Sequence, residues 1–146
     1  MKILILNGPN LNMLGIREPD IYGRDDYAAL CRTCEEACRG IGAECEVYQS
    51  NHEGCLVDKI QEAYGKVDGI VINPAAYTHT SVAIADALAA VSIPAIEIHI
   101  SKVNEREAFR RISYTASHCL TVISGEGIAG YAHAIRLLAE HLEKNK

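Results

Sequence analysis

An arginine and a tyrosine five positions apart form the first pair in this sequence that could carry chemistry. Arg17 and Tyr22 are separated by four residues, among which Pro19 stiffens the link. A free tyrosine has a pKa near 10, so only about 0.1% of it is ionised at pH 7. A guanidinium within about 4–6 Å favours the phenolate and lowers that pKa. The pair is therefore either a solvated arginine beside a half-buried tyrosine, or a phenolate base with its activator.

A histidine ends the short apolar segment Ala95–His99. In a strand, Glu97, His99 and Ser101 share one face, and the three isoleucines between them take the other. An imidazole titrates close to neutral pH and suits acid–base catalysis, and Glu97 is placed to orient it. The alternative is a histidine that is satisfied within the core.

Asn73 and His79 lie in a loop between a buried apolar strand and the helix expected over residues 82–91. Side chains such as Thr78 and Ser81 are suitable N-caps for this helix. Asparagine also often bonds its own backbone. Asn73 and His79 therefore have two open roles, which are local capping and contact with a ligand.

Apolar runs and amphipathic stretches alternate along the whole chain, and they must position these residues. We expect strands at Ile3–Leu6, Glu44–Gln49, Gly69–Asn73, Ala95–His99 and Leu120–Ser124, and helices at Asp25–Arg39, Glu53–Tyr64, Val82–Val91, Glu105–Arg111 and Tyr131–Glu143. Strict alternation predicts a parallel sheet with helices on both faces, in the flavodoxin-like α/β order 2-1-3-4-5. No repeat or linker interrupts residues 1–146, which we interpret as a single catalytic domain.

In such sheets ligands bind beyond the carboxyl ends of the strands, where the strand order reverses. Asn73 and His99 end neighbouring strands at this edge. The first strand runs into the segment from Gly8 to Arg24, which is far longer than the usual connection of about 2–6 residues. We interpret this segment, which carries Arg17 and Tyr22, as a lid over the site or as a disordered loop.

Composition excludes several classes of function. The 14 basic and 19 acidic residues give a net charge of −5, and no basic cluster suggests nucleic acid as a partner. No segment has the length of a membrane span or the apolar core of a signal peptide. Six cysteines without a secretory signal indicate free thiols and a cytoplasmic location.

Two patterns imitate cofactor or metal motifs. Gly125-Glu-Gly-Ile-Ala-Gly130 matches the dinucleotide-binding glycine pattern, but only the terminal helix follows it, so turn and close-packing glycines are the better interpretation. Cys31, Cys34 and Cys38 repeat at helical spacing and indicate one packed helix face. No cysteine–histidine pattern completes a zinc site, so we expect neither a metal nor a nicotinamide cofactor.

Taken together, the motifs resemble the type II 3-dehydroquinate dehydratases, also called type II dehydroquinases. The resemblance runs in order through much of the chain. The matching blocks are Asn7-Gly-Pro-Asn-Leu-Asn12, Arg17-Glu-Pro, Tyr22-Gly23, Gln49-Ser-Asn-His-Glu-Gly54, Asn73-Pro, Tyr77-Thr-His-Thr-Ser81, Glu97-Ile-His-Ile-Ser101, Arg106-Glu, Phe109-Arg110, Gly125-x-Gly and Gly130-Tyr131.

This resemblance implies a lyase that dehydrates 3-dehydroquinate to 3-dehydroshikimate by anti elimination through an enolate, without cofactor or metal. The reaction belongs to aromatic biosynthesis by the shikimate pathway or to quinate breakdown. Tyr22 would be the base and Arg17 its activator, and His99 would protonate the departing hydroxyl. Asn10 would position a water at the enolate oxygen, and Glu97 would orient His99.

The resemblance also implies the substrate contacts and the assembly. The implied binding residues are Asn73, His79, Arg110, the backbone N–H groups of Ile100 and Ser101, and Asp86 from a neighbouring subunit of a dodecamer built from trimers. The helix over residues 82–91 is apolar almost all round, which fits a subunit contact, although its single charge could equally be rim-exposed.

Two departures from the family pattern affect the affinity expected for the substrate. Ala75 stands where the family commonly has glycine, and Lys102 stands where it usually has asparagine.

Two rival functions are also open. A flavodoxin-like binding or signalling module would need a phosphate-binding loop after the first strand, and the segment 8–12 lacks the run of donors. An assembly protein with an inactive site is separated from an enzyme only by an assay.

Overall fold

The structure is a computed structural model that describes residues 1–16, 20 and 25–146. Arg17 and Tyr22, the predicted activator and base, lie outside the described residues. Their placement therefore stays a prediction.

Five parallel strands form one sheet. They are β1 (Lys2–Asn7), β2 (Glu44–Gln49), β3 (Gly69–Asn73), β4 (Ala95–His99) and β5 (Val122–Ser124). Their order is β2-β1-β3-β4-β5, which confirms the predicted topology. The strand order reverses between β1 and β3, where Asn7 pairs with Asn73 at the carboxyl ends.

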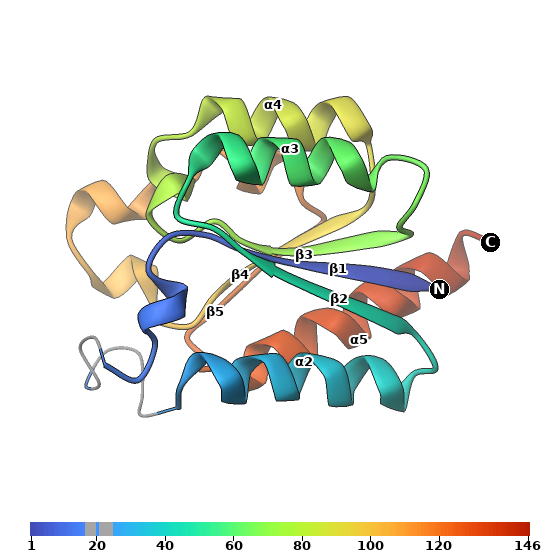
Figure 1. Cartoon of the computed structure of the whole chain (residues 1–146). Helices are drawn as coiled ribbons and strands as arrows, with labels where there is room; N and C mark the ends of the chain where they lie inside the picture. Colours follow the sequence, from blue (N-terminus) through green and yellow to red (C-terminus); the bar gives the residue numbers. More distant parts are fainter. Residues whose placement is uncertain (17–19, 21–24) are drawn as a thin grey trace.

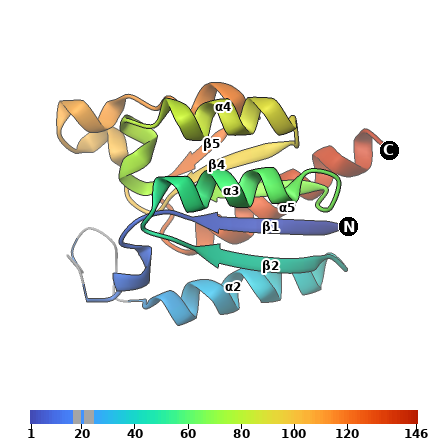
Figure 2. The same ribbon diagram turned by 45° about the horizontal axis from the view of Figure 1, so that its top comes forward.

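Four α-helices cover the two faces of the sheet in the described part of the chain. They are α2 (Tyr27–Gly40), α3 (Glu53–Ala63), α4 (Val82–Val91) and α5 (Ala129–Lys144). Figures 1 and 2 show α3 and α4 on one face and α2 and α5 on the other. Of the candidate caps for α4, Ser81 is the one used, since its hydroxyl accepts a hydrogen bond of 3.0 Å from the Ile84 N–H.

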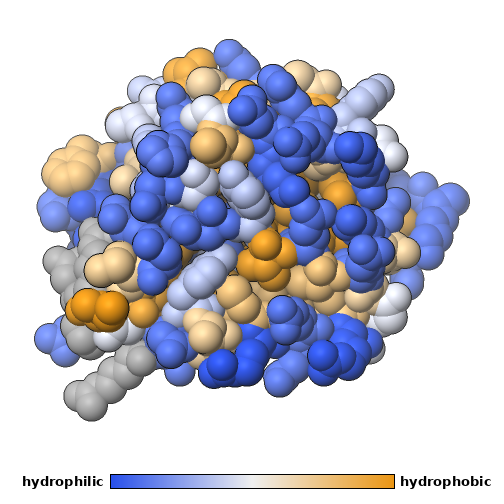
Figure 3. Space-filling view, in the orientation of Figure 1, coloured by the Kyte–Doolittle hydropathy of each residue, from blue (hydrophilic) through white to orange (hydrophobic). Residues whose placement is uncertain are grey.

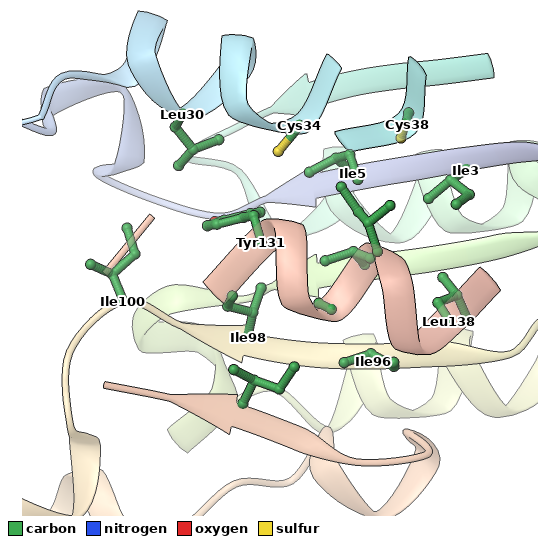
Figure 4. Packing of buried hydrophobic residues seen from close by; sticks show 14 of the residues in the cluster. Ile3, Ile5, Leu30, Cys34, Cys38, Ile96, Ile98, Ile100, Tyr131 and Leu138 are labelled. Atoms are coloured by element: carbon green, nitrogen blue, oxygen red, sulfur yellow. The ribbon is translucent and has the colours of Figure 1, made fainter. Parts of the chain in front are cut away.

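Strand alternation divides the core into two layers. Ile3 and Ile5 face α2 and α5, whereas Leu4 and Leu6 face α3 and α4. On α2, Cys34 and Cys38 are fully buried against the first layer, as Figure 4 shows. Cys34 and Cys38 therefore have the packing role that the helical spacing predicted, whereas Cys31 is only partly buried.

The predicted helix over residues 105–111 is wrong. The structure has 3-10 turns instead, at η3 (Val103–Glu105), η4 (Ala108–Arg111) and, further on, η5 (Ala116–His118). Seven residues are too few for a stable α-helix without a packed apolar face, and Phe109 is 63% exposed. The strand expected from residue 120 also begins later, at Val122.

The glycine motif after β5 makes turns and close contacts. Gly125 and Gly127 have positive φ angles of 80° and 63°. Gly130 lies in the first turn of α5 against the sheet, where a Cβ atom would lie 2.8 Å from the Ile98 side chain. These contacts confirm the interpretation of turn and packing glycines.

The surface and the helices carry no sign of a membrane-spanning segment in the described residues. None of the helices seen there combines the length and hydropathy that crossing a bilayer requires. The face in Figure 3 is largely hydrophilic, and hydrophobic residues lie in separate patches on it.

Candidate active site

A cavity lies at the carboxyl edge of the sheet, where the predicted topology puts the ligand site. Four segments line it. They contribute Pro9, Asn10, Leu11 and Leu14 around the 3-10 turn η1 (Leu11–Met13), Asn73, Ala75, Ala76 and His79 around the turn η2 (Ala75–His79), His99, Ile100 and Ser101 after β4, and Val103, Arg106 and Arg110 from η3 and η4. Seven of the predicted site residues therefore meet here: Asn10, Asn73, His79, His99, Ile100, Ser101 and Arg110.

His99 is held from behind by a buried carboxylate. The two residues lie on the same face of β4, and His99 Nε2 is 3.3 Å from Glu97 Oε2. Burial alone would raise the pKa of Glu97, but hydrogen bonds from His99, Thr115 and Thr78 together hold that pKa below its ordinary value. Glu97 is thus an anion that fixes the imidazole ring and leaves Nδ1 as the nitrogen available to a ligand.

Asn73 belongs to a buried network that sequence reasoning did not predict. Its Nδ2 donates to the Tyr131 hydroxyl at 2.9 Å, and that hydroxyl donates to Asn7 Oδ1 at 2.7 Å. Tyr131 is completely buried, which raises its pKa and keeps it a neutral donor. This tyrosine ties the ends of β1 and β3 to α5 and orients the Asn73 amide at the cavity.

Asn73 also has the local capping role that was one of its two expected functions. Its Oδ1 accepts a 3.1 Å hydrogen bond from the Ala75 N–H. The side chain is only slightly exposed, yet it lines the cavity. Capping and ligand contact are therefore compatible at this position, because each amide atom can take a second hydrogen bond.

Cationic and imidazole groups line the side of the cavity formed by η2 and η4. His79 Nδ1 lies 2.7 Å from the Ile112 carbonyl oxygen, which fixes the ring. Arg110 donates from Nε to Glu107 at 2.8 Å. Arg106 lines the same cavity, and its side chain is only 14% exposed. This residue was not predicted for the site from the sequence. These groups form a basic wall in an acidic protein and suit an anionic ligand.

Ile100 and Ser101, which follow β4, border the cavity. The Ile100 side chain also belongs to the core cluster. Within the described residues, no hydrogen bond uses the N–H of Ile100 or of Ser101. Such adjacent donors can bind a carboxylate.

Asn10 borders the cavity in a left-handed conformation, with φ of 69°. Its N–H donates to Asn51 Oδ1 at 3.0 Å, which anchors the start of η1. Asparagine tolerates this conformation better than most residues. The side chain makes no hydrogen bond to another described residue and can hold a water or ligand atom.

Among the described residues predicted for the site, Asp86 is the one that neither lines this cavity nor, like Glu97, contacts a residue that does. It is exposed on α4, outside the set of lining residues. Val82, one turn before it, is 54% exposed. The placement is compatible with either role expected for this carboxylate, at a rim or in a neighbouring site.

Lys102 also lies outside this cavity. It lines an adjoining groove with Arg106 and Asp25, and its Nζ is 3.7 Å from Glu105 Oε1. The stem of Lys102 lies against Gly125, where a Cβ would approach within 2.4 Å of it. The positive charge that Lys102 brings in place of asparagine is therefore in the groove beside the cavity.

Ala75, which stands where the family commonly has glycine, adopts a conformation that favours glycine. Its φ is 52°, a left-handed value that costs a residue with a Cβ about 1–2 kcal/mol. Replacing Ala75 by glycine should therefore raise the free energy of unfolding by about 0.5–1 kcal/mol, after allowance for the more flexible unfolded chain. Urea denaturation at fixed protein concentration measures this change.

Ala76→Gly is the matched control for this prediction. Ala76 lies next in the same turn, is exposed, and is not among the described residues with positive φ. Glycine there should lower stability by about 0.5–1 kcal/mol. Loss of stability in both variants would show that the turn is not strained at Ala75.

Comparisons with known proteins agree with the geometry. A sequence model of the family described as "Dehydroquinase class II" matches residues 1–139. A 3-dehydroquinate dehydratase of Clostridium acetobutylicum is 51% identical over 144 residues, which are 99% of this chain and 100% of that protein. A catabolic 3-dehydroquinase 1 of Fusarium vanettenii is 51% identical over 141 residues, 97% of this chain and 98% of that protein. The crystal structure of a type II dehydroquinase from Butyrivibrio crossotus superposes with a TM-score of 0.93 at 59% identity, covering 95% of this chain and 97% of that one.

Proposed function

We propose that this chain, which belongs to the class II dehydroquinase family, dehydrates 3-dehydroquinate to 3-dehydroshikimate. The observation that carries the proposal is the imidazole of His99, held by a buried carboxylate at a cavity with a basic wall. A proton donor fixed beside an anion-binding wall suits the loss of water from a hydroxy-acid. A phosphate-binding signalling module would also use a basic wall, but it would have no need of the proton donor.

The proposed elimination has two proton transfers. A base removes a proton from the carbon next to the ketone, and the electron pair forms an enolate. The enolate then re-forms the ketone and a conjugated double bond, while the C–O bond to the neighbouring hydroxyl breaks. His99, protonated on both ring nitrogens, keeps its Nε2–H on Glu97 and gives its Nδ1 proton to the departing hydroxyl, so that it leaves as water. We assign the base to Tyr22 and its activation to Arg17, both on the strength of the sequence.

The substrate carboxylate is assigned to the end of β4. The N–H groups of Ile100 and Ser101 are adjacent donors there, and Arg110 adds positive charge across the cavity. His79 and Asn73 are assigned to the ring hydroxyls, since both have ordered polar atoms at the wall. Asn10 is assigned to the water at the enolate oxygen. No step in this scheme uses a cofactor or a metal.

An assay in metal-free buffer tests the proposed function. The product contains a ketone conjugated to a new double bond, so ultraviolet absorption should grow when 3-dehydroquinate is added. The rate should be unchanged by a chelator such as EDTA. Absence of enone formation by the folded protein would reject the activity and leave the fold intact. The assay applies whether the pathway is biosynthetic or catabolic, because the reaction is the same; the Fusarium vanettenii relative is named catabolic.

We further propose a cytoplasmic homo-oligomer, a dodecamer of trimers in which Asp86 enters the site of a neighbour. The support is the exposed apolar character of α4 around Asp86, together with the six free cysteines, which suit a reducing compartment. Measurement of the native mass gives the number of subunits.

Mixing two defective variants tests the shared site. We expect Asp86→Ala and a His99 variant each to be impaired, because each lacks one component of every site. After dissociation and joint reassembly, about one quarter of the sites should combine an intact His99 with an intact Asp86 from a neighbour. Activity should therefore reappear in the mixture. Recovery no greater than the sum of the separate variants would assign Asp86 to its own subunit or to no site.

A further inference from the structure

Three hydroxyl groups surround the carboxylate of Glu97. Thr78 Oγ1 donates to Oε1 at 2.8 Å, Ser113 Oγ donates to Oε2 at 3.0 Å, and the Thr115 hydroxyl also donates to Oε1. Glu97 and Thr115 are fully buried, and Thr78 is 1% exposed. Together with His99, these groups supply a donor to the carboxylate on every side that carries a lone pair.

The three hydroxyls come from two segments that are distant in sequence. Thr78 lies in η2 after β3, whereas Ser113 and Thr115 lie between η4 and η5. The segments are joined by a 2.8 Å hydrogen bond from the Tyr114 N–H to the Thr78 carbonyl oxygen. Ser113 Oγ and Thr78 Oγ1 are also 2.6 Å apart. The cluster is therefore built by the fold rather than by one local turn.

We propose that Thr78, Ser113 and Thr115 are positioning residues for the reaction, which act on His99 through Glu97. Three donated hydrogen bonds stabilise a carboxylate that water does not reach. The ionised carboxylate accepts the Nε2–H of His99, and this contact selects the ring tautomer and the ring orientation. Neither Ser113 nor Thr115 lines the substrate cavity, so their effect on the ligand is indirect.

Loss of one hydroxyl should weaken catalysis more than binding. With fewer donors, burial favours the protonated carboxyl over the carboxylate at Glu97. A protonated or misoriented Glu97 holds His99 poorly, while the groups assigned to the substrate stay in place. This inference rests on the proposed function only for its kinetic readout.

Thr115→Val tests the proposal, because valine keeps the shape of threonine and lacks its hydroxyl. We expect kcat for 3-dehydroquinate to fall about 10- to 100-fold, with KM changed by less than about threefold. Thr115→Ser restores the hydroxyl and should recover most of kcat. In a Glu97→Gln background, Thr115→Val should have little additional effect, since both changes act on one contact.

Thr33→Val is the matched control. The Thr33 hydroxyl donates to the Ala29 carbonyl oxygen at 3.0 Å on α2, away from Glu97. This variant should keep the parental kcat. If Thr115→Val folds and keeps the parental kcat, or if Thr115→Ser is as impaired as Thr115→Val, the proposal is wrong. Should Thr115→Val fail to fold, Ser113→Ala at the same carboxylate gives the same comparison.

A spectroscopic measurement separates this proposal from the proposed activity. In the parental protein, ring ¹⁵N shifts of labelled His99 should report a protonated Nε2 in the neutral form. Thr115→Val should shift these signals toward a mixture of tautomers, and Thr33→Val should not. If the parent lacks dehydratase activity but its His99 signals respond in this way, the proposed function fails and the positioning role stands. Unchanged signals would reject the positioning role whatever the activity.

Discussion

The His99→Asn protein should dehydrate 3-dehydroquinate about 10²- to 10⁴-fold more slowly than the parent, the usual contribution of one positioned acid or base. Asparagine is polar and can still face Glu97, but it has no proton to give at neutral pH. The C–O bond would then break with hydroxide as the leaving group, unless water supplies the proton. Steady-state kinetics by enone absorption measure the loss.

The loss should fall mainly on kcat. The groups assigned to the substrate carboxylate, at the end of β4 and on Arg110, are retained in this variant, so KM should change little. His133→Asn is the matched control, because the His133 side chain is 41% exposed on α5 and pairs with Glu126 at 2.9 Å. Retention of more than a tenth of the parental kcat in His99→Asn would remove His99 from the acid role.

The parallel sheet could be predicted because each strand carries its own signal. β1 and β3 are continuous apolar runs, and both are completely or almost completely buried, as strands covered on two faces must be. The alternation along β4 assigned Glu97 and His99 to one face, and the structure shows the isoleucines between them in the core on the other. The local pattern of apolar and polar residues was sufficient to predict which face of the strand each of these residues takes.

The segment from η3 to η5 could not be predicted in the same way. Its conformation depends on contacts with distant elements, such as the hydrogen bond between Tyr114 and Thr78. A short charged run such as residues 105–111 has a helical composition, but it lacks the apolar face that would hold a helix on the sheet. The same contacts bring Ser113 and Thr115 to Glu97, and no spacing rule connects positions 16 or more residues apart.

Tyr131 and Arg106 were missed for different reasons. Tyr131 stands within an apolar helix face, where an aromatic residue normally indicates packing, and only the structure shows its hydroxyl between Asn7 and Asn73. Arg106 lies in the segment whose conformation was predicted wrongly. A tyrosine beside the Gly130 close contact, however, is a signal that sequence reasoning could have used, because its side chain is thereby directed at the sheet.

Replacing Tyr22 by phenylalanine should lower kcat about 10²- to 10⁴-fold while substrate binding is retained. Phenylalanine keeps the ring and removes the oxygen that is proposed to take the proton from the substrate. The carboxylate contacts assigned to Ile100, Ser101 and Arg110 do not involve this hydroxyl. Calorimetric binding of the product should therefore give nearly the parental Kd, and turnover by enone absorption should be almost lost.

Arg17→Gln should produce a different defect, which identifies the arginine as the activator. Without the guanidinium, the proposed phenolate is less favoured, so the rate should fall near pH 7 and recover as the pH is raised. Tyr22→Phe should show no such recovery, because no phenol is present to ionise.

Tyr64→Phe serves as the control for the loss of one phenol in Tyr22→Phe, since Tyr64 is 69% exposed at the end of α3. A Tyr22→Phe protein that keeps more than a tenth of the parental kcat would show that the proton is removed by another group.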